Sequence, residues 1–140
     1  MADPIPKIMN KRAILTWWSV GAGGMDAMTG LLLIVAPLFV LRLLGIAPVA
    51  DDALLFLSWV GVFVLGVGMS YGLALTGRAR GEAAWIFTTL VRGLVAVFLT
   101  VKVLSEAMEP AWLVVAAGDG LVAVAQGVIL FSGWWKEEPS

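Results

Sequence analysis

Three ionisable residues lie inside long apolar stretches of the sequence: Asp26, Arg92 and Asp119. Asp26 is about nine residues past Trp17, and Arg92 and Asp119 are about nine and eight residues past the starts of their stretches. A helix rises ~1.5 Å per residue, so all three fall near one depth. An isolated charge at the centre of a bilayer costs at least about 2.5–3.5 kcal/mol. We therefore predict that Arg92 bridges both carboxylates, because a planar guanidinium can engage two acids at once.

Polar side chains near these charges along the helices predict a polar pocket around them. Its expected members are Tyr71, Thr29, Thr88, Thr89 and Gln126. Buried polar groups of this kind sometimes fix how helices pack. They also mark proton or ion pathways, or pockets for a lipid or quinone headgroup. Both interpretations of the cluster stay open at this point.

The sequence contains no cysteine and no histidine. This excludes disulfides, thiol redox chemistry, Fe–S clusters and tetrapyrroles bound through imidazole. No metal site and no catalytic group is predicted, and no cofactor is expected beyond contact with lipid or quinone. A formal net charge of −1 gives no nucleic-acid footprint.

The composition predicts an all-α integral membrane protein with a single transmembrane domain, 1–140. Of its 140 residues, 61% are hydrophobic and 14% charged, which is more apolar than soluble domains are. Four apolar stretches have the length that a helix needs to cross a bilayer. They run over about 13–36, 53–76, 83–104 and 111–135.

Short connections predict how the four spans are arranged. The turns 77–82 and 105–110 are brief, so sequential helices must be antiparallel neighbours, as in an up-down four-helix bundle. The connection between the first two spans is longer. Residues 38–45 within it predict a short interfacial helix, with Arg42 reaching the headgroups.

Seven tryptophans lie mostly near the ends of the predicted spans. Indole prefers the headgroup level, so we interpret them as an aromatic belt rather than as core filling. They are Trp17, Trp18, Trp59, Trp85, Trp112, Trp134 and Trp135.

Cationic residues gather at one set of span ends. These are Lys7, Lys11, Arg12, Arg78, Arg80 and Lys136, whereas the other ends carry mostly acids. Because cytoplasmic loops carry an excess of Lys and Arg, we predict that both termini and the 77–82 turn are cytoplasmic.

Three segments resemble the DoxX-like small bacterial membrane proteins. They are the run from Gly30 to Gly45 with its Pro37, Arg92-Gly-Leu in the third span, and Gly118-Asp-Gly in the fourth. The resemblance implies a four-helix bundle in the bacterial inner membrane. Some relatives are associated with quinone-linked sulfur oxidation or with redox-linked membrane assemblies. The missing cysteine argues against thiol-linked roles here, and no catalytic residue is carried over.

These observations favour a non-catalytic small subunit or accessory protein of a larger inner-membrane complex, redox- or quinone-linked if the resemblance holds. Its expected partners are the lipid bilayer and other membrane subunits. The alternative is a small transporter or channel in which Asp26, Arg92 and Asp119 form a gate. A quinone- or lipid-interacting enzyme component is a third class, in which Tyr71 and the two aspartates would handle protons.

Overall fold

The computed structural model describes residues 10–136, and that part of the chain contains helices and turns but no strand. The all-α prediction is therefore confirmed. Lys7 and the two chain ends, on which the predicted orientation partly depends, lie outside the described residues.

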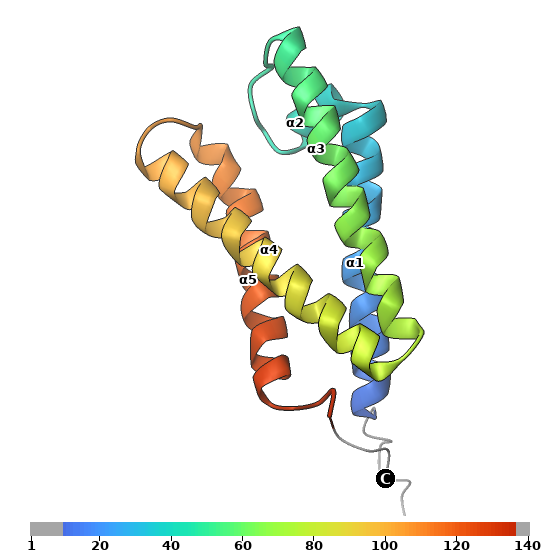
Figure 1. Cartoon of the computed structure of the whole chain (residues 1–140). Coiled ribbons are helices and arrows are strands. Elements are labelled where there is room, and N and C mark those ends of the chain that lie inside the picture. The colour runs from blue at the N-terminus through green and yellow to red at the C-terminus, as the bar shows by residue number, and fades with distance from the viewer. Residues whose placement is uncertain (1–9, 137–140) are drawn as a thin grey trace, which may run out of the picture.

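Within residues 10–136 the chain forms five α-helices and two short 3₁₀ helices (Figure 1). In chain order they are α1 (Lys11–Val35), α2 (Pro37–Leu43), α3 (Asp51–Ser70), η1 (Tyr71–Leu75), α4 (Arg78–Leu104), η2 (Pro110–Trp112) and α5 (Leu113–Phe131). Four stretches are long and apolar enough to cross a membrane, as predicted. They are Lys11–Val35, Asp51–Leu75, Arg78–Leu104 and Pro110–Phe131.

The fourth stretch ends earlier than the sequence predicts. Helix α5 stops at Phe131, and residues 132–136 form a turn instead of continuing to 135. Gly133 has φ +74°, in the left-handed region where glycine is favoured and where a right-handed helix cannot continue. The turn folds the last two tryptophans back toward the other helices.

The long helices alternate in direction and pair as two hairpins (Figure 1). Helix α3 packs along α1, and α5 packs along α4. The hairpins converge at the end where η1 lies, and η1 contacts both α1 and α4. From that end the two pairs of ribbons diverge (Figure 1). The up-down order is as predicted, and α1 with α3 and α4 with α5 are antiparallel neighbours. The expectation that the second and third spans are also neighbours holds only at η1, because α4 packs against η1 and not along α3. The bundle is therefore divided into two closely packed halves.

Glycines allow α1 and α3 to pack backbone against backbone. A Cβ added at Gly30 would lie 2.3 Å from the Leu65 nitrogen, and one at Gly68 would lie 2.4 Å from the Ala27 nitrogen. Gly23 and Gly61 are similarly crowded by the facing helix. Small residues favour such close approach between apolar helices. We call these four glycines the glycine seam.

Helix α2 and the segment after it cover the wider end. Pro37 occupies the start of α2, where its missing N–H is not needed. Leu41 and Ile46 are buried, whereas Arg42 is exposed. The backbone N–H of Ala47 donates to Glu109 Oε2 at 3.3 Å, so this segment reaches the α4–α5 connection.

Two tryptophans are core residues, so the belt prediction is wrong for them. Trp85 is 0% exposed and Trp135 6%, and their rings meet edge to face with centroids 5.4 Å apart. Trp17 and Trp59, by contrast, are 68% and 60% exposed. The sequence places all four near span ends. It does not show that helices converge at one end, where a ring facing the neighbouring helix becomes buried.

Candidate functional site

The fold brings Asp26, Arg92 and Asp119 together, and we call these three residues the charge cluster. Each lies near the middle of its helix, on α1, α4 and α5 respectively. Because neighbouring helices run antiparallel, residues at mid-helix come to the same level. The cluster therefore joins the α1–α3 hairpin to the α4–α5 hairpin.

Arg92 is buried, and each of its three side-chain nitrogens donates a hydrogen bond within the chain. Nη2 donates to Asp26 Oδ2 at 2.6 Å, and Nη1 donates to Asp119 Oδ1. Nε donates to the Tyr71 hydroxyl at 3.3 Å. The guanidinium is thus held from three directions by α1, α5 and η1, which is a use of its planar fork that lysine could not reproduce.

A chain of buried polar groups continues from Arg92. The Tyr71 hydroxyl accepts from Arg92 and donates to Gln126 Oε1 at 2.9 Å. Gln126 Nε2 donates to the Thr88 hydroxyl at 3.4 Å, and that hydroxyl donates to the Trp85 carbonyl at 3.2 Å. Buried polar groups are costly unless they are paired, and here each one is paired. We call Tyr71, Thr88 and Gln126 the polar network.

A second side-chain link joins the hairpins nearer to η1. Trp85 Nε1 donates to the Ser19 hydroxyl at 2.8 Å, and that hydroxyl donates to the Leu15 carbonyl at 2.7 Å. Sequence reasoning missed this link. A signal exists, because Ser19 and Trp85 each precede a charge-cluster residue by seven positions. Seven residues are about two helical turns, so each shares the inward face of its charged neighbour.

The five residues of the predicted pocket do not all meet. Tyr71, Thr88 and Gln126 lie in the interior beside Arg92. Thr29 is exposed and lies outside this arrangement. The Thr89 hydroxyl is buried without a partner, and its methyl group faces Gly127 on α5. Thr88 and Thr89 are successive residues, so a rotation of about 100° around the helix separates a side chain in the network from one outside it.

The charge cluster contains two acids and one base, so in its ionised form it carries one excess negative charge. The Asp26 side chain is 12% exposed and the Asp119 side chain 21%. Chemically, this arrangement can hold two hairpins together, and it can also accept one proton or one small cation. Among residues 10–136, no group of three or more acidic side chains is placed to hold a metal ion.

Comparison with known proteins identifies no relative of this chain. No family model, no curated protein and no solved structure matches the chain. The resemblance to DoxX-like proteins stays a prediction, and the role of the charge cluster is argued from the contacts described above.

Proposed function

We propose that this chain is a multi-pass protein of the bacterial inner membrane, with both termini cytoplasmic, that serves as a non-catalytic accessory subunit of a larger membrane complex. The observation that carries the proposal is the way Arg92 is held within the chain. All three of its side-chain nitrogens are engaged by residues of the same chain, so the polar centre serves to join the two hairpins.

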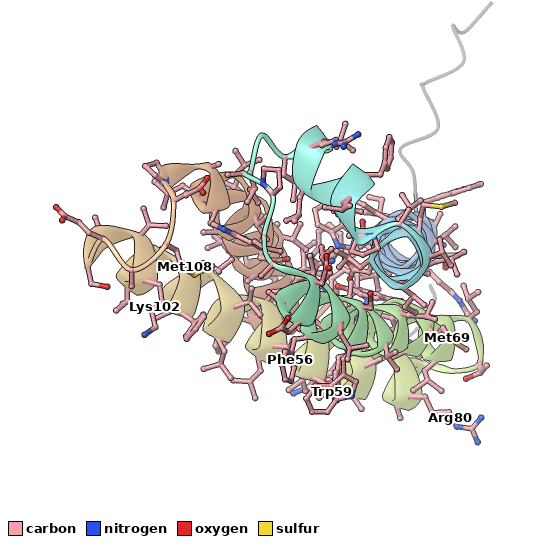
Figure 2. The ribbon with its side chains drawn as sticks, turned by 90° about the horizontal axis from the view of Figure 1, so that it is seen from above. Phe56, Trp59, Met69, Arg80, Lys102 and Met108 are labelled. Carbon is pink, nitrogen blue, oxygen red and sulfur yellow. The ribbon has the colours of Figure 1, made fainter. Side chains whose placement is uncertain are left out.

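The outward surface supports membrane placement. Large apolar side chains such as Phe56, Trp59 and Met69 are exposed and point away from the helices (Figure 2). Soluble monomers rarely expose apolar patches beyond a few hundred Å². Four long apolar helices with such a surface fit a lipid environment, in which backbone groups are satisfied within each helix.

The distribution of charge supports the proposed orientation. Segments 1–12, 77–82 and 136–140 together hold six cationic and four acidic residues. Segments 37–52 and 102–110 hold two cationic and four acidic residues. Five cations of the first set lie in the part of the chain that the structure describes, at the end where η1 lies: Lys11, Arg12, Arg78, Arg80 and Lys136. The positive-inside rule assigns that end to the cytoplasm.

The interior supports a non-catalytic role. Tyr71, the polar side chain nearest to Arg92 apart from the two aspartates, is used both as acceptor and as donor. The buried Ser19 and Thr88 hydroxyls donate to backbone carbonyls, which is a structural use. A nucleophile would need an adjacent base and access to substrate. The exposed apolar faces remain for lipid and for partner helices, and the DoxX-like resemblance points to a redox- or quinone-linked assembly.

Extraction in mild detergent tests the accessory role. The chain is tagged at native expression level, and its particle mass is measured by size exclusion with light scattering. We expect the protein mass of the particle, without its bound detergent, to lie well above the 14.8 kDa of one chain. Other membrane proteins should be present in it at a fixed ratio. The matched control is the same chain overexpressed in large excess over its partners, and most of this protein should be extracted without them. A homogeneous single chain at native level would contradict the proposal.

A second candidate function is a small cation or proton transporter. The excess negative charge of the charge cluster favours this function, because it leaves one carboxylate able to accept a proton or a cation. Asp119 is the better placed of the two aspartates for this, because its side chain is the more exposed. Flux into liposomes should then be lost in Asp119→Asn and kept in Thr29→Ala, since Thr29 is exposed and outside the cluster. Absence of flux in the unmodified protein under any imposed gradient would reject this function.

A further inference from the structure

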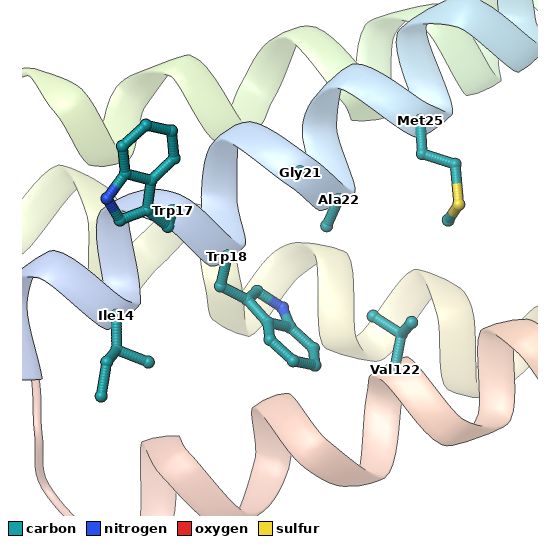
Figure 3. A pocket seen from close by; sticks show the side chains of 7 residues that line it. All are labelled: Ile14, Trp17, Trp18, Gly21, Ala22, Met25 and Val122. Atoms are coloured by element: carbon teal, nitrogen blue, oxygen red, sulfur yellow. The ribbon is translucent and has the colours of Figure 1, made fainter. Parts of the chain in front are cut away.

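An apolar groove runs along α1 and is bordered on its other side by α5. The groove is shallow and open to the surroundings, with a volume of about 470 Å³. Its lining includes Ile14, Trp18, Gly21 and Met25 of α1 and Val122 of α5 (Figure 3). The α1 positions recur at intervals of three or four residues, so they share one face of the helix. This surface is distinct from the charge cluster, which lies on the inward face of the same helix.

The groove has the length of one bilayer leaflet. From Ile14 to Met25 it follows eleven residues of α1, or roughly 16 Å of helix. Half of the hydrocarbon core is about 15 Å thick. The groove begins close to the first residue of α1 and ends next to Asp26, which marks the central depth. It therefore matches an acyl chain that enters from the end of α1 and stops at mid-membrane.

The end at which the groove opens is cationic. Lys11 and Arg12 begin α1, and Lys136 follows α5, the other helix that borders the groove. Lys11 lies over the ring of Trp134 at 5.5 Å, which holds its ammonium group at this end. Clusters of Lys and Arg at a membrane surface attract anionic lipid headgroups. The charge at the mouth thus complements a phosphate.

The Trp18 indole provides an independent indication of a polar ligand atom. Its N–H is buried and has no acceptor in the structure. The ring lies between α1 and α5, with its nitrogen on the side that faces Ala22 and Val122 (Figure 3). Buried donors are nearly always paired. A small turn of the ring would present this donor to an ester carbonyl, which a phospholipid carries just below its phosphate.

We propose that this groove binds one acyl chain of an anionic phospholipid of the cytoplasmic leaflet. The chain lies along α1 from Ile14 to Met25, and the phosphate is held by the cationic residues that begin α1. The inference rests on the membrane placement proposed above, and it does not depend on the accessory role.

Two glycines of α1 provide a matched pair of variants. A Cβ added at Gly21 or at Gly24 meets nothing within 4 Å, so a side chain at either position starts in open space. Gly21 lines the groove, whereas Gly24 is exposed elsewhere on the same helix. Gly21→Leu therefore fills the groove, and Gly24→Leu adds the same side chain outside it.

The test uses vesicles of equal parts phosphatidylglycerol and phosphatidylcholine. The full chain is reconstituted, floated with the vesicles, extracted gently and analysed by native mass spectrometry. We expect the unmodified protein and Gly24→Leu to retain one phosphatidylglycerol, and Gly21→Leu to retain at least about tenfold less. Replacing Lys11 and Arg12 by glutamine should remove the preference for phosphatidylglycerol while a lipid of either kind is still retained.

Each other outcome overturns a defined part of the proposal. Equal retention in Gly21→Leu and Gly24→Leu would show that the groove is not the lipid site. A dimer that Gly21→Leu abolishes, with no lipid bound, would assign the groove to a second copy of the chain. A protein that floats but retains no phosphatidylglycerol rejects the groove alone. A protein that does not float with vesicles rejects the membrane placement itself.

Discussion

Arg92 is the side chain on which the junction between the two hairpins depends. It is buried, it carries a permanent charge, and its partners come from α1, α5 and η1. A guanidinium in such a position cannot lose its proton to avoid the cost of burial. Its charge must therefore be compensated by neighbouring residues. Asp119 belongs to the same hairpin as Arg92, whereas Asp26 and Tyr71 can pair with it only while the two hairpins stay together.

Loss of Arg92 should be far more damaging than loss of Asp119. Arg92→Met leaves two buried carboxylates unpaired, and removing one partner of a buried ion pair costs about 3–5 kcal/mol. Asp119→Asn leaves Arg92 paired with Asp26 as a neutral unit, so this variant should lose clearly less stability than Arg92→Met. Thermal unfolding in detergent, followed by tryptophan fluorescence, measures both. Equal losses of stability in the two variants would show that the junction depends on Asp119 as much as on the guanidinium.

Restoring stability to Arg92→Met should require the removal of both acids. The triple variant Arg92→Met, Asp26→Asn, Asp119→Asn removes every charge from the cluster, whereas the double variant with Asp119→Asn alone leaves Asp26 unpaired. Residues in one such network show coupling energies of about 0.5–3 kcal/mol. We expect unfolding temperatures to rise from the Arg92→Met variant to the double variant and again to the triple variant. Strict additivity would contradict a shared network.

Tyr71→Phe should lower the free energy of unfolding by about 1–3 kcal/mol. The change leaves Arg92 Nε and the Gln126 carbonyl oxygen without a partner in the interior. Ser58→Ala is the matched control, because the Ser58 hydroxyl bonds only to the Leu54 carbonyl of its own helix. Denaturant titration of the two variants should separate them, and equal stabilities would remove Tyr71 from the centre of the network.

At the scale of the elements, each hairpin has its own means of packing. The glycine seam brings the α1 and α3 backbones together, so those helices pack without large interlocking side chains. Helices α4 and α5 themselves pack less closely: a Cβ on Gly120 would lie 3.6 Å from Ala96, which is ordinary van der Waals contact. The crowded glycine of that hairpin is Gly81, where a Cβ would lie 2.4 Å from the Trp135 ring of the turn after α5. The first hairpin is therefore the one in which an added methyl group would meet the backbone of the facing long helix.

Gly68→Ala should weaken the α1–α3 hairpin. The added Cβ would lie 2.4 Å from the Ala27 nitrogen, which belongs to a helix backbone and cannot turn aside. Overpacking of this kind costs about 1–3 kcal/mol. Gly66→Ala on the same helix meets nothing within 4 Å and should be close to neutral. The unfolding temperatures of the two variants, compared in one detergent, check the difference.

The whole molecule is organised by its two ends. Among residues 10–136, the end where η1 lies gathers the buried tryptophans and five cationic residues, and the other end carries α2 and four acids. The hairpins diverge from the first end toward the second (Figure 1). In the proposed membrane placement, these ends face opposite sides of the bilayer.

Single cysteines should report opposite sides at these two ends. The chain has no cysteine of its own, so any label reports only the introduced residue. Ser132 and Ser105 are both exposed, in the turn after α5 and in the α4–α5 connection respectively. In intact cells, a membrane-impermeant maleimide should label Ser105→Cys, and it should label Ser132→Cys only after the membrane is permeabilised. The reverse pattern would invert the orientation, and labelling of both from outside would reject four spans.

Sequence alone determined the helical class, the approximate spans and the level of the three charges, because these depend on hydropathy and on residues counted along one helix. It also predicted that one guanidinium would bridge two acids, the arrangement found in the structure. Only the tertiary structure decided that α3 and α4 do not pack along each other, that Tyr71 bonds to Arg92, and that Thr29 lies outside the cluster. It also turned Trp85 and Trp135 inward. The physical reason is that hydropathy shows how deep a residue lies in its helix, whereas the direction its side chain faces depends on how the helices rotate and converge.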